Sequence, residues 1–326
     1  MHDHLGSTAG PSQHVAAAGR SVCPLRFPRR FPGERGCGSR AGCAIVEASP
    51  PHPRRAPVCR LLGYVADQPV SVVDVLGEDG FARFTALTAV HGDGWGMAWQ
   101  AEDRSVRSVT VPGSASADPA YEGLARKRLG RAGLVHLRWA SSGLEIATTN
   151  THPFTDDGPA GGVAFAHNGH IAPIPRLEGL LTAASRERLE GDTDSERYFR
   201  FVLQCAEEEG DLDAGLVRAL DVLVREFPTA SLNALMLTPD QMFAVHINSS
   251  AAAPQRALLE LFDRPEEIPS GHSAEAYFAM DFRTLPDAVH VISSGLDEEG
   301  WTPVPADTAA VVDLATRRVT ALRRPA

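Results

Sequence analysis

Regular patterns of apolar and polar residues begin at Cys59 and continue to the end of the chain. Short runs that alternate, or that are rich in β-branched and aromatic residues, predict strands. We expect strands at residues 59–66, 94–100, 106–111, 134–140, 162–167, 231–237, 242–247, 276–282, 289–293, 310–314 and 319–323. The run at 162–167 is apolar almost throughout, which is typical of a buried strand.

Helical patterns occupy mainly the middle of the chain. We expect helices at residues 117–130, 176–189, 193–209 and 213–227. The third opens with Thr193-Asp-Ser-Glu196, the pattern of a capping box, and Thr238-Pro239-Asp240 predicts a hairpin turn between two strands. Because strands come first, helices follow and strands return, the order predicts an α+β fold with helices packed on antiparallel sheets.

The first 58 residues differ in composition from the rest. They hold eight arginines and three acidic residues, a net charge of +5, whereas residues 59–326 have a net charge of −15. Proline and glycine interrupt the segment and no periodic pattern persists, so we expect disorder. The chain therefore divides into a leader, residues 1–58, and one folded domain, residues 59–326.

An error in the assigned start of translation explains the leader better than a targeting signal does. All but one of the 31 basic residues are arginine, a bias typical of GC-rich coding sequences, in which open frames extend upstream of true starts. Val58 directly precedes Cys59, and a GTG codon encodes valine internally but methionine at a start. Our hypothesis is that Val58 marks the start and that the mature protein begins at Cys59. A twin-arginine signal at Arg29 and Arg30 lacks the apolar region that should follow it.

Charge and hydropathy argue against two classes of function. No apolar run approaches the roughly 18 residues that a membrane-spanning helix requires, so we expect no membrane association and a cytoplasmic protein. The formal net charge of −10 argues against a dedicated nucleic-acid-binding protein. Cysteine and acidic residues match neither zinc nor calcium spacings, so we expect no metal and no cofactor.

Cys59 becomes a candidate nucleophile if it is the first residue of the protein. Its own α-amine, with an ordinary pKa of about 7.7–8.0, is then available to accept the thiol proton near neutral pH. A cysteine inside a chain is more often a small buried apolar residue. We interpret Cys205 in that way, because it follows Phe199 and Val202 on a predicted helix.

Polar residues also end two of the predicted strands. His136-Leu-Arg138-Trp-Ala-Ser141 offers a guanidinium that suits a substrate carboxylate, or alternatively a structural ion pair. His167-Asn168-Gly169 offers an amide and a backbone N–H that suit an oxyanion hole, or alternatively a tight turn.

Two further segments allow more than one interpretation. Asp194 suits a substrate ammonium group, or alternatively a helix cap. His91-Gly-Asp-Gly-Trp-Gly96 lacks the lysine of a phosphate-binding loop, and its glycines indicate a close approach of backbone to the site.

Taken together and in this order, the motifs resemble those of the class II glutamine amidotransferases. The motifs are Cys59-Arg-Leu-Leu-Gly, His91-Gly-Asp-Gly-Trp-Gly, His136-Leu-Arg-Trp-Ala-Ser, Thr149-Asn-Thr-His-Pro-Phe, His167-Asn-Gly and Thr193-Asp-Ser-Glu. More narrowly, they look like the stand-alone bacterial subgroup that includes the ergothioneine-pathway amidohydrolase. The likeness covers nearly all of residues 59–326 and none of the leader.

The resemblance implies an N-terminal-nucleophile hydrolase sandwich with helix, sheet, sheet and helix layers. It further implies that Cys59 attacks the γ-carbonyl of a glutaminyl group, with its α-amine as base through a water. Asn168 and Gly169 would stabilise the oxyanion, and water would then release glutamate from a γ-glutamyl thioester.

The resemblance also implies how the substrate is held. Arg138 would bind the α-carboxylate and Asp194 the α-ammonium group, with Ser141 in support. Trp139 and His152 match the pattern and would shape the pocket.

Three functions remain open at this stage. The chain hydrolyses glutamine as the ammonia-supplying partner of a separate synthase, it hydrolyses a γ-glutamyl amide of some metabolite, or it is a non-catalytic glutamyl-binding module. The family's synthases commonly carry Thr-His after Arg-Trp-Ala, where this chain has Ser141 and Ser142. The sequence does not name the leaving amine.

Overall fold

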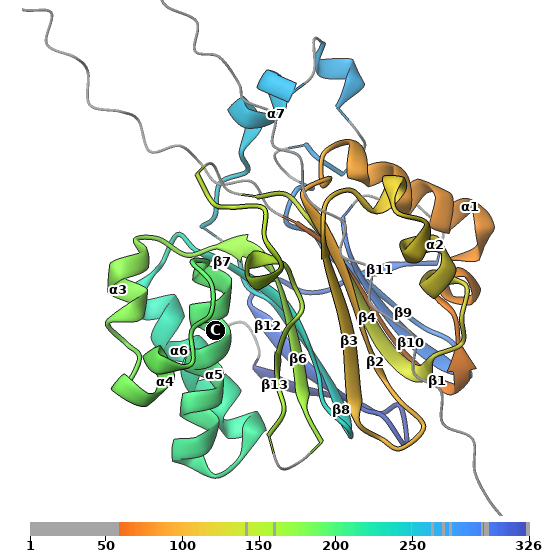
Figure 1. Ribbon diagram of the computed structural model, residues 1–326. Coiled ribbons are helices and arrows are strands. Elements are labelled where there is room, and N and C mark those ends of the chain that lie inside the picture. Colours follow the sequence, from red (N-terminus) through yellow and green to blue (C-terminus); the bar gives the residue numbers. More distant parts are fainter. Residues whose placement is uncertain are drawn as a thin grey trace, which may run out of the picture. The chain divides into compact units, whose positions relative to one another are not determined.

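Two antiparallel β-sheets lie at the centre of the fold, and helices cover the outer face of each sheet (Figure 1). The structure is a computed structural model that describes residues 59–140, 143–158, 161–248, 250–261, 264–268, 271–273, 276–294, 296 and 300–323. The leader, Val58 included, and the candidate residue Ser141 lie outside the described residues.

The first sheet places the candidate nucleophile on a central strand. Its seven strands follow the order β11-β9-β10-β1-β4-β2-β3. Arg60 at the start of β1 lies opposite Leu137 near the end of β4. The strands are β1 (Arg60–Val70), β2 (Gly94–Gln100), β3 (Val106–Pro112), β4 (Gly130–Arg138), β9 (Met280–Thr284), β10 (Ala288–Ser293) and β11 (Thr302–Pro303).

The second sheet carries the candidate oxyanion-binding residues on β6. Its six strands follow the order β13-β12-β8-β7-β6-β5. They are β5 (Phe154–Asp156), β6 (Val163–His170), β7 (Ser231–Leu237), β8 (Gln241–His246), β12 (Thr308–Asp313) and β13 (Val319–Arg323). The predicted hairpin between β7 and β8 is confirmed, since Thr238 N donates to the Gln241 carbonyl at 2.9 Å.

Helices form the two outer layers. On the first sheet lie α1 (Val72–Ala86), η1 (Leu87–Ala89), η2 (Ala115–Ala117) and α2 (Pro119–Ala125). On the second lie α3 (Ile174–Glu178), α4 (Ala183–Glu187), α5 (Asp194–Glu209) and α6 (Leu212–Glu226). Three short elements complete the described chain: η3 (Thr148–Asn150), α7 (Gln255–Leu261) and η4 (Pro265–Glu267). No helix in these described ranges is long and apolar enough to cross a membrane.

Three apolar clusters correspond to the three interfaces between layers. Leu62 and Tyr64 of β1 pack with α1 and α2, whereas Leu61 and Val65 face the second sheet. The outer face of the second sheet packs against α5 and α6. This alternation follows from the two-residue period of a strand. The predicted α+β fold, with two antiparallel sheets between helix layers, is confirmed.

Several predicted helix boundaries are wrong. The helix expected at 117–130 ends at Ala125, because β4 already begins at Gly130. The stretch 176–189 forms the two short helices α3 and α4, the second capped by the Thr182 side chain. Helix α1 was not predicted, because the apolar run at its start has no helical period and Gly77, with φ of 73°, interrupts the helix.

The capping box at α5 is only half present, and one strand starts late. Thr193 Oγ1 accepts from Glu196 N at 3.1 Å, as predicted. The Glu196 carboxylate, however, accepts from the backbone of Glu190 and Gly191, at 2.7 and 2.8 Å.

The strand expected at 276–282 begins only at Met280, because the preceding residues form a turn.

Candidate active site

Cys59 lies immediately before β1 and is 7% exposed. Arg60 holds its backbone, since Nη1 donates to the Cys59 carbonyl at 2.9 Å and Nη2 donates to the Gly271 carbonyl at 3.2 Å. The same guanidinium lies over the ring of Tyr277, 5.0 Å from its centroid. The candidate nucleophile is thus buried and anchored by an arginine that the sequence analysis did not single out.

Burial dominates the electrostatics of the Cys59 thiol. It raises the pKa of Cys59 to about 11, although the positive charges of Arg138 and Arg60 act in the opposite direction. The thiol donates a long hydrogen bond to the Trp139 carbonyl, with 3.9 Å between sulfur and oxygen. At neutral pH the group is therefore protonated, and it requires a base before it can attack a carbonyl carbon.

Arg138 ends β4 and shares the inner face of that strand with Leu134 and His136. Its Nη2 donates to the Glu145 carbonyl at 3.3 Å, whereas its buried Nη1 has no partner among the described residues. It forms no ion pair with a carboxylate of the described residues, so the alternative of a structural ion pair is not observed there. Burial lowers the pKa of Arg138, and the nearby Cys59 and Asp93 oppose that shift.

Asn168 and Gly169 lie within β6, so the alternative of a tight turn is wrong. The Asn168 side chain is completely buried, and neither its Nδ2 nor its Oδ1 has a partner within the described part of the chain. Pairing between β5 and β6 ends at Phe165, which leaves one edge of β6 without a strand partner beyond that residue. A Cβ at Gly169 would lie 2.0 Å from the Ser231 carbonyl oxygen, so this position requires glycine for packing as well.

Asn168 and Cys59 project from facing sheets at the same end of the sandwich. Leu61 and Ala166 belong to the cluster between the sheets. Cys59 lies two residues before Leu61, and Asn168 lies two residues after Ala166, so each occupies the next inward-facing position. Because β1 leaves this end and β6 arrives at it, the amide is brought toward the thiol.

Asp194 is the first residue of α5, and Thr193, not Asp194, caps that helix. The Oδ2 atom of Asp194 accepts a hydrogen bond from Ile171 N at 2.6 Å and lies 3.5 Å from His170 Nδ1. Burial by itself raises the pKa of Asp194, but His170 and His167 outweigh it, so the net shift is downward. The interpretation as a helix cap is wrong, and the carboxylate stays ionised near the thiol, whose pKa it raises.

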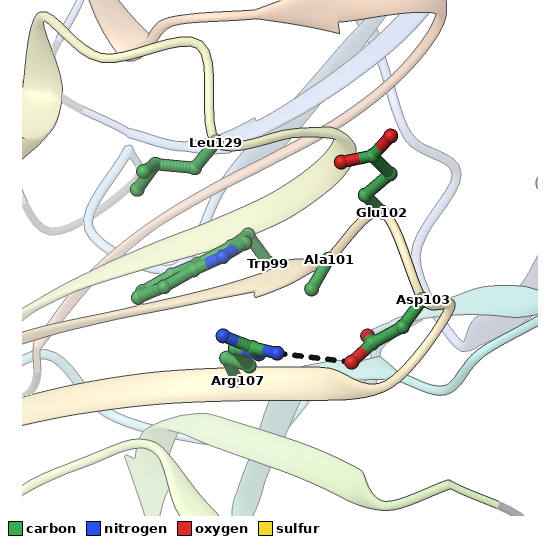
Figure 2. Close-up of a pocket in the computed structure, with 6 residues that line it drawn as sticks. All are labelled: Trp99, Ala101, Glu102, Asp103, Arg107 and Leu129. Atoms are coloured by element: carbon green, nitrogen blue, oxygen red, sulfur yellow. Dashed lines mark hydrogen bonds and ion pairs between the residues drawn. The ribbon is translucent and has the colours of Figure 1, made fainter.

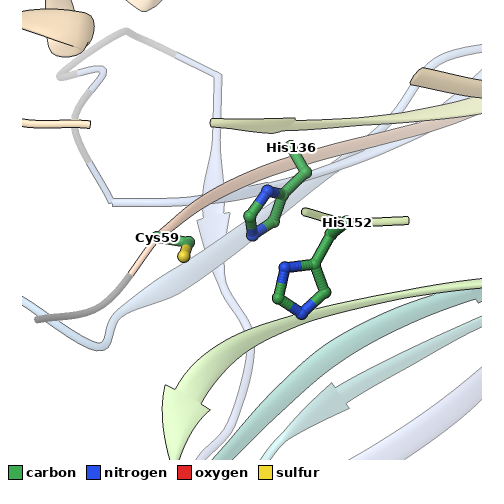
Figure 3. Close-up of side chains that lie close together, drawn as sticks. All are labelled: Cys59, His136 and His152. Atoms are coloured by element: carbon green, nitrogen blue, oxygen red, sulfur yellow. The ribbon is translucent and has the colours of Figure 1, made fainter. Parts of the chain in front are cut away.

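Two buried histidines lie beside Cys59, as Figure 3 shows. The rings of His136 and His152 have centroids 4.1 Å apart, and their nearest nitrogens and the Cys59 sulfur all lie within 4.8 Å of one another. Burial lowers the pKa of His136 to about 3 and holds that of His152 well below its ordinary value. His152 therefore lies beside Cys59, and its role in shaping the pocket stays a prediction. His136 was given no role in the sequence analysis, although its position two residues before Arg138 was a signal.

The glycine-rich segment His91–Gly96, which runs into the start of β2, approaches the site closely, as its sequence indicates. A Cβ at Gly96 would lie 2.1 Å from the His152 carbonyl oxygen. Asp93, which the sequence analysis gave no role of its own, accepts from Ala140 N at 2.8 Å through Oδ2 and donates its N–H to the Arg138 carbonyl at 3.0 Å. The segment thereby holds the chain that leaves β4, where Trp139 presents its carbonyl to the thiol.

A hollow of about 460 Å³ lies away from Cys59 (Figure 2). Trp99 lines it and pairs with Gly133, whereas Gly94 at the other end of β2 pairs with Arg138. Five residue steps along a strand span about 17 Å, so this hollow is separate from the cysteine. Its lining residues are Trp99, Ala101, Glu102, Asp103, Arg107 and Leu129.

Solved structures with a similar fold include two amidotransferases. A glutamine aminotransferase class-II domain protein from Silicibacter pomeroyi superimposes with a TM-score of 0.53 at 19% identity, over 81% of this chain and 98% of that one. The glutamine phosphoribosylpyrophosphate amidotransferase from Bacillus subtilis superimposes with a TM-score of 0.55 at 12% identity, over 81% and 49%. The chain therefore shares the fold of these two proteins, with two antiparallel sheets between helix layers.

Sequence comparison defines the family more narrowly. The family model for class II glutamine amidotransferases matches residues 58–264, more than half of the chain. A Haemophilus influenzae protein whose name assigns it to the glutamine amidotransferases is 30% identical over 148 residues, 45% of this chain and 47% of that protein. Glutamine–fructose-6-phosphate aminotransferase of Mycobacterium leprae is 30% identical over 184 residues, 54% and 28% of the two chains. The matched region thus spans about half the length of these relatives or less.

The chain belongs to the class II glutamine amidotransferase family.

Proposed function

We propose that the protein hydrolyses the γ-carboxamide of glutamine or of a γ-glutamyl amide, with Cys59 as its N-terminal nucleophile. The observation that carries the proposal is one buried site in which the binding groups lack partners. The Cys59 thiol lies near the unpaired Arg138 Nη1 and the Asp194 carboxylate, and the unpaired Asn168 amide projects from the facing sheet. Buried polar groups without partners are costly, so a ligand is expected to supply the missing hydrogen bonds.

The charges of the site match the α-substituents of a glutamyl group. Arg138 would pair with the α-carboxylate, for which a guanidinium provides parallel donors. Asp194, held by Ile171 N and ionised, would pair with the α-ammonium group. Fixing both substituents orients the γ-carbonyl toward the sulfur, and orientation of this kind contributes strongly to rate.

The neighbouring histidines are poor candidates for the base. Moving a proton from a thiol with a pKa of about 11 to an imidazole with a pKa of about 3 is uphill by on the order of 10 kcal/mol. An α-amine has an ordinary pKa of about 7.7–8.0, above the ordinary 6.5 of an imidazole, so it is the stronger base in like surroundings. We therefore assign the role of base to the Cys59 α-amine, which requires that no residue precede Cys59 in the active protein.

The proposed reaction has two steps. The amine accepts the thiol proton as sulfur attacks the γ-carbonyl carbon, and the tetrahedral oxyanion receives hydrogen bonds from Asn168 Nδ2 and Gly169 N–H. The C–N bond breaks, and the proton passes to the departing ammonia or amine, which leaves a γ-glutamyl thioester on Cys59. Water then attacks the thioester with the amine as base, and glutamate and the free thiol are released. The match of the family model from residue 58 onward supports a start at this point.

Release of glutamate from glutamine and from a panel of γ-glutamyl amides tests this function. We expect Cys59→Ala to lower kcat by at least about a thousandfold, as removal of a nucleophile does in other hydrolases. Cys205→Ala is the matched control, because that cysteine is 1% exposed within the α5 core and should leave kcat unchanged. If the wild-type protein and Cys59→Ala are equally inactive over the whole panel, the non-catalytic glutamyl-binding module replaces the enzyme.

The same panel identifies the leaving group. A strong preference for a bulky γ-glutamyl amide over glutamine indicates hydrolysis of a metabolite. Ammonia release from glutamine that rises when a co-encoded synthase is added indicates an ammonia-supplying subunit.

A further inference from the structure

The trio formed by Cys59, His136 and His152 contains a set of metal-ligand atoms that the hydrolytic reaction does not use. One thiol sulfur and two imidazole nitrogens lie within 4.8 Å of one another, and all three residues are buried (Figure 3). Both ring nitrogens of His152 are buried and have no hydrogen-bond partner among the residues that the structure describes. In a purely structural histidine pair, the ring nitrogens would be expected to form hydrogen bonds. A structural role alone therefore does not explain these unpaired nitrogens.

The chemistry of the trio favours zinc among common divalent cations. Zn²⁺ binds cysteine sulfur and histidine nitrogen, whereas Mg²⁺ and Ca²⁺ require several oxygen ligands. No carboxylate belongs to the trio. Three protein ligands with a fourth position left for water is the coordination number that catalytic zinc sites commonly have.

The geometry requires only small side-chain movements. In a tetrahedral site with Zn–S near 2.3 Å and Zn–N near 2.0–2.1 Å, neighbouring ligand atoms lie roughly 3.5 Å apart. The present upper limit of 4.8 Å would have to shorten by about 1 Å, within reach of χ rotations of the three side chains. The backbone of His167 lies beside the His136 ring and is placed to orient it, as outer-shell groups commonly do for metal-bound histidines.

We propose that Cys59, His136 and His152 form a zinc-binding site that overlaps the nucleophile and competes with the glutamyl substrate. Binding releases the thiol proton to solvent and forms one Zn–S and two Zn–N bonds, with no redox change. The bound sulfur can no longer attack a carbonyl carbon. Whatever path admits a glutaminyl group to Cys59 also admits a small hydrated cation. The competition rests on the proposed function; the binding itself does not.

Direct metal binding tests the site without reference to activity. The full chain is freed of metal, titrated with Zn²⁺ against a chromophoric chelator, and examined with Co²⁺ for sulfur-to-cobalt charge-transfer absorption. We expect Cys59→Ser to abolish that absorption and His152→Ala to weaken Zn²⁺ affinity by at least roughly tenfold, since loss of an outer-shell group alone costs 10–100-fold. Cys59→Ser keeps Cys23, Cys37 and Cys43, so zinc held by the leader would remain and be recognised.

Cys205→Ala controls for loss of a buried thiol and should bind zinc as the wild type does. The proposal is overturned if the wild-type chain gives no charge-transfer absorption, or if Cys59→Ser and His152→Ala bind zinc as the wild type does. Circular dichroism of each variant identifies unfolding, and absence of the charge-transfer absorption from the wild-type chain overturns the proposal whether or not a variant folds.

Activity measurements separate the two proposals. Inhibition of glutamate release by Zn²⁺, relieved by a chelator and by higher glutamine concentration, is expected if both hold. Zinc binding at the trio without any hydrolytic activity would contradict the proposed function and support the metal site. If Zn²⁺ at concentrations far above that of the enzyme leaves hydrolysis unchanged, the result contradicts the metal site and supports the proposed function.

Discussion

Asn168 and Asn233 are cross-strand neighbours with opposite hydrogen-bonding states. Both are completely buried, but Asn233 Nδ2 donates to the Phe278 carbonyl at 2.8 Å, whereas the Asn168 amide has no partner. A buried polar group without a partner lowers stability, and a group that serves the transition state increases rate. At the scale of the residue, this pair compares an amide that we propose binds the oxyanion with one that holds the structure together.

We therefore expect opposite effects from two alanine substitutions. Asn168→Ala should lower kcat by about 10²–10³-fold, the usual effect of losing one oxyanion donor, and should change the free energy of unfolding by less than about 1 kcal/mol because no hydrogen bond is lost. Asn233→Ala should lower the free energy of unfolding by about 1–3 kcal/mol because it leaves the Phe278 carbonyl with fewer donors. Steady-state kinetics and denaturant unfolding measure both. Unchanged kcat in Asn168→Ala would exclude the oxyanion role.

The base gives a second prediction at this scale, through the pH dependence of kcat/KM. The amine must be unprotonated to accept the thiol proton, so kcat/KM should rise with pH through the amine's pKa, ordinarily about 7.7–8.0. Below that range, we expect a tenfold fall for each pH unit. A rate that is independent of pH down to about 5 would contradict an amine base.

Stability must be followed over the same range. His136 has a pKa of about 3 in the folded protein, while an unfolded histidine takes up a proton near its ordinary value of 6.5. The unfolded state therefore binds more protons between these values, and the free energy of unfolding falls as pH decreases from about 6.5 toward 3. Circular dichroism at each pH distinguishes this loss of folded protein from protonation of the base.

At the scale of the element, close packing of β2 against the segment that carries His152 shapes the site. Gly96 leaves no space for a side chain, since a Cβ would lie 2.1 Å from the His152 carbonyl oxygen and 2.7 Å from Pro153 Cδ. A Cβ at Gly123, within α2, would instead meet no atom within 4 Å outside the backbone of its own helix, and a helical position suits alanine. A methyl side chain therefore fits at position 123 but not at position 96.

Gly96→Ala should lower the free energy of unfolding by roughly 1–3 kcal/mol through overpacking, and should lower activity by displacing the His152 segment. Gly123→Ala, the matched control, should raise the free energy of unfolding by up to about 1 kcal/mol and leave activity unchanged. Thermal unfolding and glutamate release measure the pair. Equal stability of the two variants would mean that β2 does not require the close approach.

At the scale of the whole molecule, the proposed chemistry depends on where the chain begins. A peptide bond to Val58 would convert the α-amine into an amide and remove the base. We expect the intact mass of protein expressed from the native gene, with its upstream region, to correspond to a chain that begins at Cys59. A variant with one alanine inserted before Cys59 that is retained in the product should lose glutamate release by at least about a hundredfold. Active protein that retains residues 1–58 would contradict the assignment of the base.

Much of the fold could be predicted because strands and helices have different periods. The strands at 231–237 and 319–323 agree with the structure residue for residue, and α5 and α6 begin and end within one residue of the prediction. The helix α1 was missed because its first turn is a run of valines and aspartate, and Gly77 breaks its period. Intrinsic helix propensity contributes too little free energy to determine the structure of such a segment. Packing on the first sheet stabilises this helix instead.

The sequence by itself determined the residue types of the site, the α+β class of the fold, and the position of the composition boundary at Cys59. Only the tertiary structure decided which interpretation of each polar residue holds, because that depends on partners distant in the chain. Arg138 and Asn168 each retain an unpaired buried nitrogen, Asp194 is not a helix cap, and Arg60 and His136 join the site. Burial and several hydrogen bonds of the site arise from residues far apart in the chain, such as Cys59 with Trp139 and Arg60 with Gly271, and no local pattern encodes them.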